Sequence, residues 1–241
     1  MFSSAGAKTA LVTVGHTDLH ELTQSELALI PGVERDREFG SARRRQQYLC
    51  GRSLLRRMLQ NQTGEPAISH QLTTTGSGKP VCIDGPAISI THTGDRVVCG
   101  VAEDGDIGID LELMTERRDI SRIARKFFSD EESTWLETQA KDRFIMLWVL
   151  KEAYVKAVGR SIFGGINRLR CKVEPPYIYT ISMADQMRDL CLYVADDSLL
   201  AIATTEASLA TIEFERWDTD TGKQTSSNEY HLLAMTGEPE D

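Results

Sequence analysis

The sequence predicts an α+β fold made of two similar halves. Two stretches have the periodicity of amphipathic helices, and each is followed by a series of short segments rich in β-branched residues. The elements therefore run helix then strands, followed by helix then strands. We expect residues 1–115 to form the first half, residues 116–217 the second, and residues 218–241 a polar, loosely held tail.

The two helices are expected at about residues 41–60 and 141–158. The apolar face of the first consists of Tyr48, Leu49, Leu55, Met58 and Leu59. The apolar face of the second consists of Phe144, Ile145, Trp148, Ala153, Val155 and Val158. Gly64 and Pro66 are expected just beyond the end of the first helix, and Gly159 is a natural stop for the second.

The segments between and after the helices are expected to be strands. Residues 87–90, 97–102 and 107–113 are separated by turn residues, which predicts a meander. After Gly164 and Gly165, further strands are expected at residues 171–173, 177–181, 190–194, 199–204 and 211–214.

Composition places the chain among ordinary globular proteins. Its 241 residues are 41% hydrophobic and 26% charged, which is enough apolar material for a sizeable core. There are 27 Lys and Arg against 36 Asp and Glu, so the net charge is −9. This acidic balance argues against a protein whose main task is to coat nucleic acid, and we expect no nucleic-acid partner.

The sequence also predicts a cytoplasmic protein. No window approaches 18 apolar residues and the first ten residues lack the apolar core of a signal peptide, so we expect no membrane association. The cysteines are odd in number and contain no CxxC pair, which favours reduced thiols in the core over disulfides or zinc ligands. They are Cys50, Cys82, Cys99, Cys171 and Cys191.

The hexapeptide at residues 107–112 is the most informative local feature. Alternate side chains of a strand share a face, so Asp110 and Glu112 are expected to point the same way. Two such carboxylates suit Mg²⁺ bound together with phosphate. The alternative for this segment alone is a solvated strand face.

The second helix offers a third carboxylate and a cation. Glu152 and Lys156 are four residues apart and therefore adjacent on the helix surface. The alternative is a routine surface ion pair, which contributes only about 0.3 to 0.5 kcal/mol.

Two further segments offer groups that bind anions. Gly78-Lys79-Pro80 precedes Ile88-Ser89-Ile90-Thr91-His92-Thr93-Gly94, so Lys79 and His92 bracket a strand of small polar residues. Residues 35–57 contain eight Arg against Asp36 and Glu38, a local charge of +6. The alternatives are a structural histidine and a solvated helix face.

Taken together, these segments resemble the 4′-phosphopantetheinyl transferases of the surfactin-activating type. The resemblance covers about residues 35–165 and rests on three motifs, Gly-Lys-Pro with "ISITHTG", "IGIDLE", and "KFFSDEE…LWVLKEAYVKAVG". One departure is Thr91-His92-Thr93, where the family usually has Ser-His-Ser. The family architecture implies halves related by a pseudo-two-fold axis, with coenzyme A bound in a cleft between them.

The resemblance implies transfer of the phosphopantetheine arm of coenzyme A to a serine of an acidic apo carrier protein. Asp110, Glu112 and Glu152 would hold Mg²⁺, with Glu152 also the best-placed base and Lys156 a cation for the phosphates. The expected coenzyme A-binding residues are Lys79, Pro80, Thr91, His92, Arg45, Arg52 and Lys151, with Arg35 a further candidate for the 3′-phosphate.

Two alternative functions stay open, and two further expectations concern the carrier and the oligomeric state. The same carboxylates could serve a Mg²⁺-dependent phosphohydrolase acting on a coenzyme A-like pyrophosphate, or the chain could bind coenzyme A or a carrier without catalysis. The basic segment at residues 117–126 closely follows the expected strand that carries Asp110 and Glu112, and it is the expected docking site of the carrier. Because one chain contains both halves, we expect a monomer.

Overall fold

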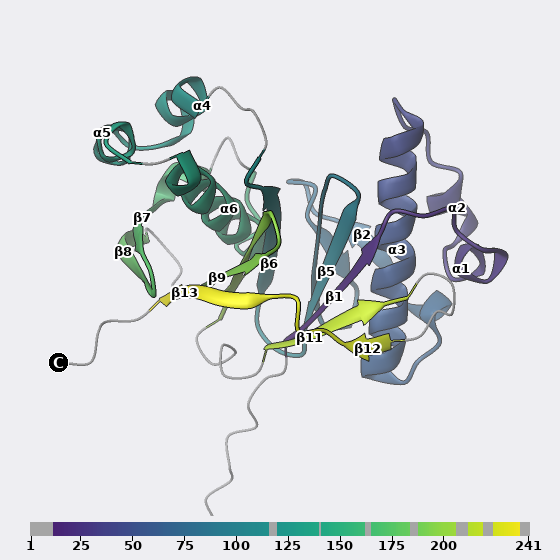
Figure 1. Cartoon of the computed structure of the whole chain (residues 1–241). Coiled ribbons are helices and arrows are strands. Elements are labelled where there is room, and N and C mark those ends of the chain that lie inside the picture. The colour runs from purple at the N-terminus through teal and green to yellow at the C-terminus, as the bar shows by residue number, and fades with distance from the viewer. Residues whose placement is uncertain are drawn as a thin grey trace, which may run out of the picture.

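The computed structural model describes residues 12–115, 120–139, 141–161, 165–183, 188–205, 212–218 and 224–236. Within these residues the chain forms two large β-sheets, and one long helix lies on the outer face of each (Figure 1). The strand order is β12-β11-β1-β5-β4 in the first sheet and β6-β10-β9-β13-β8-β7 in the second. A separate two-stranded sheet is formed by β2 (Leu72–Thr74) and β3 (Pro80–Cys82).

The bounds of the remaining strands fall into two groups. The first sheet contains β1 (Val12–Asp18), β4 (Ala87–Thr93), β5 (Arg96–Ala102), β11 (Ile212–Trp217) and β12 (Gln224–Ser226). The second contains β6 (Ile107–Leu113), β7 (Leu169–Glu174), β8 (Tyr177–Met183), β9 (Asp189–Ala195), β10 (Ser198–Thr204) and β13 (His231–Thr236).

The α-helices are α1 (Gln24–Ala28), α2 (Gly32–Arg35), α3 (Ala42–Thr63), α4 (Ile120–Phe127), α5 (Asp130–Glu137) and α6 (Lys141–Ala157). Two 3₁₀ turns, η1 (Ala67–Ser69) and η2 (Ile166–Arg168), complete the helical elements of the described residues. The two helices predicted from the sequence are α3 and α6. Both are confirmed to within a few residues at each end.

Sequence signals account for the ends of α3. The Ser41 hydroxyl accepts a hydrogen bond from the Arg44 amide over 3.3 Å, which satisfies one of the unpaired donors of the first turn. Gly64 ends the helix in the left-handed conformation with φ of 77°, which glycine adopts without steric cost. The predicted stop near this glycine is confirmed.

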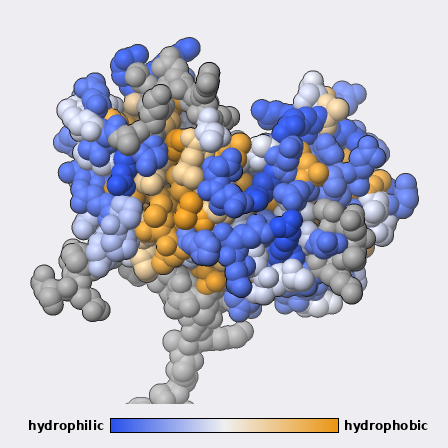
Figure 2. All heavy atoms as spheres, viewed as in Figure 1, coloured by the Kyte–Doolittle hydropathy of each residue, from blue (hydrophilic) through white to orange (hydrophobic). Residues whose placement is uncertain are grey.

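The core has four layers, in the order α3, first sheet, second sheet, α6. Leu55 and Leu59 of α3 pack against one face of β5, while Val98 on the other face packs against Ile109 of the second sheet. Leu147 and other residues of α6 pack on the far side of the second sheet. Strands β5 and β6 are therefore buried on both faces. On the face shown in Figure 2, the α3 side is hydrophilic and apolar residues gather over α6 and the second sheet.

The predicted meander is wrong in its last strand. β4 and β5 pair as expected, but β6 pairs antiparallel with β10, with Asp110 opposite Ala201. The turn at Asp104–Gly105 carries the chain from one sheet to the other, so β6 faces β5 across the core instead of extending its sheet. Its apolar residues Ile107 and Ile109 fill the space between the two sheets.

The expectation of a loose tail is also wrong for the described residues after 218. β12 pairs with β11, and β13 lies between β9 and β8 in the second sheet. Strand β13 has only one fully buried residue, Ala234. Although four of its six residues are apolar, β13 is therefore held mainly by backbone pairing with its neighbours.

Two connections link the sheets in ways that the linear order of elements does not show. β6 comes from the expected first half but belongs to the second sheet, and β11 returns to pair in parallel with β1. The division at residue 115 stays a prediction. The five cysteines are buried and free, as predicted. No helix in the described segments is long and apolar enough to cross a membrane.

Candidate active site

Three carboxylates meet between β6 and α6. Asp110 and Glu112 lie on the face of β6 that α6 covers, and Glu152 comes from α6 itself. Each offers an oxygen, and these oxygens all lie within 4.8 Å of one another. Asp110 and Glu112 are only 4% and 7% exposed. The alternative of a solvated strand face is therefore excluded, because the helix covers these side chains.

The close approach of α6 depends on Gly108. A Cβ at this position would lie 2.0 Å from the Ala153 carbonyl oxygen and 2.3 Å from the Ala157 amide nitrogen. Only glycine lets the helix backbone lie directly on the strand at this point. The contact fixes α6 two residues before Asp110 and on the same face of the strand, and this places Glu152 and Lys156 opposite the strand carboxylates.

Hydroxyl groups of β4 satisfy the free edge of β6. The Ser89 Oγ accepts from the Ile109 amide over 3.0 Å, and the Thr91 Oγ1 accepts from the Leu111 amide over 3.3 Å. The Thr91 hydroxyl also lies 3.1 Å from Asp110 Oδ1, to which it donates. The small polar residues of the "ISITHTG" segment thus join the first sheet to β6, the strand that carries Asp110 and Glu112.

Asp110 has one satisfied and one unsatisfied carboxylate oxygen. The Lys156 ammonium donates to Asp110 Oδ1 over 2.6 Å and to the Ile109 carbonyl over 3.0 Å. Asp110 Oδ2 is buried and has no hydrogen-bond partner among the described residues. A buried anionic oxygen is costly without a partner. A cation bound by the three carboxylates would supply that partner.

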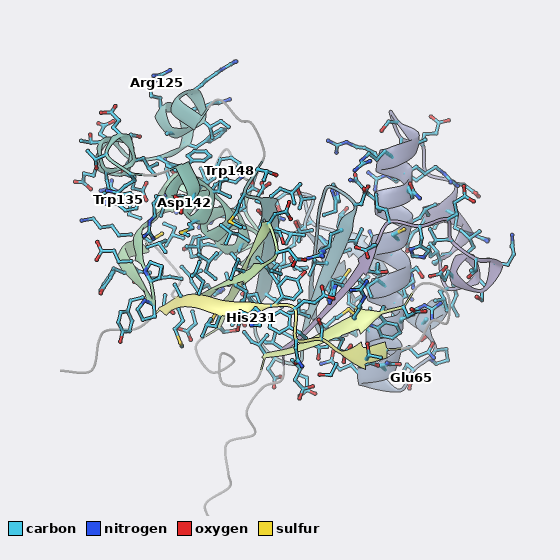
Figure 3. All side chains as sticks on the ribbon, in the orientation of Figure 1. Glu65, Arg125, Trp135, Asp142, Trp148 and His231 are labelled. Carbon is cyan, nitrogen blue, oxygen red and sulfur yellow. The ribbon has the colours of Figure 1, made fainter. Side chains whose placement is uncertain are left out.

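Glu112 is oriented by Trp148. The indole N–H of Trp148 donates to Glu112 Oε1 over 3.0 Å. The Trp148 ring, labelled in Figure 3, lies against Phe144 at a centroid distance of 6.2 Å with an interplanar angle of 13°, and its centroid is 5.7 Å from that of Phe127. One ring therefore links a ligand-type carboxylate to the aromatic core beneath α6.

A pocket of about 360 Å³ adjoins the carboxylates, with residues of both predicted halves in its walls. It is lined by Ser77, Gly78, Lys79, Pro80, Ser89, Ile90, Val155, Lys156, Arg160 and Ser161. Lys156 belongs both to this lining and to the carboxylate cluster. The size is within the range of small-molecule sites.

The two basic residues of the Gly-Lys-Pro and "ISITHTG" segments lie in different surroundings. The Lys79 ammonium donates to the Ala157 carbonyl at the end of α6 over 2.8 Å, and burial lowers its pKa. His92 is exposed on β4. Partial desolvation lowers its pKa, and the nearby charges of Lys156 and Arg44 lower it further.

Comparison with known proteins shows the family to which the chain belongs. Residues 106–230, more than half of the chain, match the model of the 4′-phosphopantetheinyl transferase superfamily. The chain belongs to this superfamily. The matched region contains the carboxylate strand, α6 and most of the second sheet.

Three relatives of this chain are named 4′-phosphopantetheinyl transferases. The transferase psf-1 of Bacillus pumilus is 33% identical, over 64% of this chain and 66% of its own length. The transferase gsp of Aneurinibacillus migulanus is 32% identical, over 49% and 51%, and HetI of Nostoc sp. is 29% identical, over 66% and 70%. The chain thus spans between 51% and 70% of the length of these relatives. The family expected from the three motifs is confirmed.

Lys151, which was expected to bind coenzyme A, lies inside the protein. It is fully buried and forms a 2.9 Å ion pair with Glu132 of α5. Its ammonium also donates to the carbonyls of Ile166 and Leu169, over 3.3 and 2.5 Å. These three contacts match the three donors of a lysine. The expectation that Lys151 binds coenzyme A is therefore wrong, because its charge is neutralised inside the second half.

The two arginines expected at the coenzyme A site point elsewhere. Arg52 is buried on α3, where its Nε lies 3.3 Å from a carboxylate oxygen of Glu34 and its guanidinium lies over the Tyr48 ring at 5.1 Å. Arg45 is exposed and donates to the Arg35 carbonyl over 3.4 Å. Neither lines the pocket. The local charge of +6 is thus partly neutralised by internal pairs.

Several residues of the site were not predicted from the sequence. Ser89 and Trp148 lie within recognised motifs, but their hydrogen bonds to β6 depend on the packing of separate elements. Arg160 and Ser161 follow Gly159 directly and line the pocket. A basic residue just beyond the end of the helix that carries Glu152 was the available signal for Arg160.

Proposed function

We propose that the chain transfers the 4′-phosphopantetheine arm of coenzyme A to a serine of an apo carrier protein and releases adenosine 3′,5′-bisphosphate. The observation that carries this proposal is the cluster of Asp110, Glu112 and Glu152 beside Lys156 and the pocket, in a member of the phosphopantetheinyl transferase superfamily. An acidic carrier would meet coenzyme A at this pocket.

The donor set fits Mg²⁺. Three carboxylates provide hard oxygen ligands, and Asp110 Oδ2 is a buried oxygen that lacks a partner among the described residues. Asp110, Glu112 and Glu152 would hold the ion, with Glu112 oriented by Trp148. When bound, Mg²⁺ neutralises charge that develops on the pyrophosphate during transfer.

Two protein residues have further tasks in the transfer. The serine oxygen of the carrier forms a bond to the phosphorus that bears the pantetheine, and the bond from this phosphorus to the bridging oxygen breaks. Glu152 is half-buried at the cluster, and we assign to it the proton of the serine hydroxyl. Lys156 contributes positive charge at the junction of cluster and pocket, where the bisphosphate leaves.

Coenzyme A is proposed to occupy the pocket between the Ser77–Pro80 segment and the end of α6. Lys79 and Pro80 line one wall, and Lys156 lines the other. Thr91 and His92 lie on β4, whose residues Ser89 and Ile90 also line the pocket. We assign the cleft between the two halves, and the pseudo-two-fold axis that relates them, to the region of this pocket. The placement of α3 on one sheet and α6 on the other supports that assignment.

The carrier is proposed to dock on the basic segment around α4. Arg122, Arg125 and Lys126 are exposed there, and Figure 3 shows Arg125 on the outer side of this helix. Arg117 and Arg118, also predicted to contact the carrier, lie outside the described residues. An acidic carrier would be steered to such a surface, and the attraction would weaken as salt increases.

The proposal is tested by following coenzyme A in the presence and absence of a carrier. With Mg²⁺ and an apo carrier, we expect the bisphosphate to appear in proportion to modified carrier. With a carrier whose acceptor serine is replaced by alanine, we expect neither product. Release of the bisphosphate at the same rate without any carrier would contradict transfer and indicate a phosphohydrolase.

A further inference from the structure

The loop between β2 and β3 has a shape fixed by its own hydrogen bonds. The Gly78 amide donates to the Thr75 carbonyl over 2.9 Å, and Gly78 has a φ of 87°, which glycine adopts without steric cost. The Thr75 Oγ1 also accepts from the Lys79 amide over 3.1 Å and lies 2.7 Å from the Ser77 hydroxyl. These contacts within the loop orient Ser77 and Lys79.

Ser77 and Lys79 both donate to the end of α6. The Ser77 hydroxyl donates to the Gly159 carbonyl over 2.8 Å, and the Lys79 ammonium donates to the Ala157 carbonyl over 2.8 Å. The last carbonyls of a helix lack partners within the helix and lie at the negative end of its dipole, so donors and cations stabilise this end. The loop therefore caps α6 from outside the helix.

This cap joins parts of the fold that are far apart in the sequence. β3 contacts β4 at the edge of the first sheet, whereas α6 covers the second sheet. The last turn of α6 also lies against β6 at Gly108. The same turn carries Lys156, whose ammonium donates to Asp110 Oδ1 over 2.6 Å. A shift of this turn would therefore displace Lys156 from the carboxylate cluster.

We infer that the loop at residues 75–79 is a clamp on the end of α6, and that Ser77 is a positioning residue that keeps Lys156 and Glu152 opposite the strand carboxylates. The inference rests on the proposed function for the reaction that is served. Ser77 lines the pocket but does not belong to the carboxylate cluster, so it acts on the transfer through α6. Accurate placement matters here, because a misplacement of about 1 Å can lower a rate about a hundredfold.

Hydrogen exchange in the free protein tests the clamp. The amides of residues 158–160 donate to carbonyls of the last turns of α6, so their exchange reports the opening of this end. We expect Ser77→Ala to raise their exchange rates about three- to tenfold, the scale of one lost hydrogen bond. Ser77→Thr keeps the hydroxyl and should restore most of the protection.

Kinetics test the positioning role. At saturating coenzyme A and carrier, we expect the kcat of Ser77→Ala to fall about three- to tenfold and that of Ser77→Thr to stay close to the wild type. The Kd for coenzyme A, measured by calorimetry, should change less than kcat. Ser69→Ala is the matched control, because the exposed Ser69 hydroxyl donates to the Pro66 carbonyl over 2.7 Å on η1, outside the pocket lining. It should match the wild type in all three measurements.

The outcomes separate the clamp from the proposed function. Unchanged exchange in Ser77→Ala would overturn the inference and leave the proposed function standing. Faster exchange with a wild-type kcat would also overturn it, and so would a raised Kd without faster exchange, which would make Ser77 a direct contact of coenzyme A. A folded wild type that transfers nothing would contradict the proposed function, while the exchange rates would still test the clamp.

Discussion

The indole N–H of Trp148 donates to Glu112 Oε1 over 3.0 Å and so joins α6 to β6 across the carboxylate cluster. Both residues are almost fully buried. Groups that orient ligands in this way commonly change metal affinity tenfold to a hundredfold when removed. Trp148 is therefore a positioning residue for Glu112.

Replacing Trp148 by Phe tests this role. The variant keeps an aromatic ring beside Phe144 but lacks the hydrogen-bond donor. We expect the Mg²⁺ concentration for half-maximal transfer to rise about tenfold or more. Trp135→Phe on α5 is the control, because Trp135 packs at the margin of the same core without belonging to the carboxylate cluster. An unchanged Mg²⁺ requirement in Trp148→Phe would show that Glu112 needs no such support.

Replacing Asp110 by Asn should remove a carboxylate while nearly preserving shape. We expect transfer to fall at least about a hundredfold, the scale of a lost electrostatic contact in a preorganised site. The circular dichroism spectrum should stay that of the wild type, because the contribution of Asp110 is charge and not packing volume. Near wild-type turnover at saturating Mg²⁺ would remove Asp110 from the proposed ligands.

Because Lys151 forms a buried ion pair with Glu132, we expect its replacement to lower the stability of the fold and not the affinity for coenzyme A. Lys151→Met leaves the Glu132 carboxylate buried without its cation, and breaking such a pair costs about 3 to 5 kcal/mol in the free energy of unfolding. Adding Glu132→Leu should restore part of that loss, because the buried charge is then removed as well. Denaturant titration measures both effects. A single variant as stable as the wild type would contradict the structural role of Lys151.

The contrast between Lys151 and Lys156 shows how far the sequence alone reaches. Strand period predicted that Asp110 and Glu112 share a face, and helical spacing predicted that Glu152 and Lys156 are adjacent. Both predictions depend on local geometry and were correct. The burial of Lys151 depends on Glu132 of another helix, which no local pattern reveals.

The same limit applies to the fold. α3 and α6 have strong periodicity and clear ends, so both could be predicted. The partner of β6 could not, because Asp104–Gly105 is an ordinary turn whether the next strand pairs or crosses to another sheet. β1 was missed although it is buried along most of its length, and β13 was missed because this short strand lies in a tail that is otherwise polar.

Buried His16 gives the protein a sensitivity to acid. It is 2% exposed and its Nε2 lies 2.9 Å from the Ser227 hydroxyl, which ties β1 to the segment before β13. Burial lowers its pKa to about 4, despite the opposing effect of Glu229. In the unfolded chain His16 has its ordinary pKa of 6.5 and is protonated below that pH. In the folded chain His16 stays neutral until the pH falls to about 4.

The stability contributed by neutral His16 is therefore complete above about pH 6.5 and is lost as the pH falls toward 4. We expect the free energy of unfolding of the wild type to decline more steeply over this range than that of His16→Gln, which has no group to protonate there. The difference between the two curves reports His16 together with its neighbour Glu229, whose carboxylate lies 3.9 Å from the His16 ring. Parallel curves would show that the pKa of His16 is not lowered on folding.

The central claim is tested most directly by the intact mass of an apo carrier protein after incubation with the enzyme, coenzyme A and Mg²⁺. We predict that the wild type adds the mass of one phosphopantetheine to the carrier. We predict little or no addition by Asp110→Asn at the same enzyme concentration, and none with a carrier that lacks its acceptor serine. An unmodified mass across fatty acid, polyketide and peptide carriers, from a folded wild type that binds coenzyme A, would contradict the account.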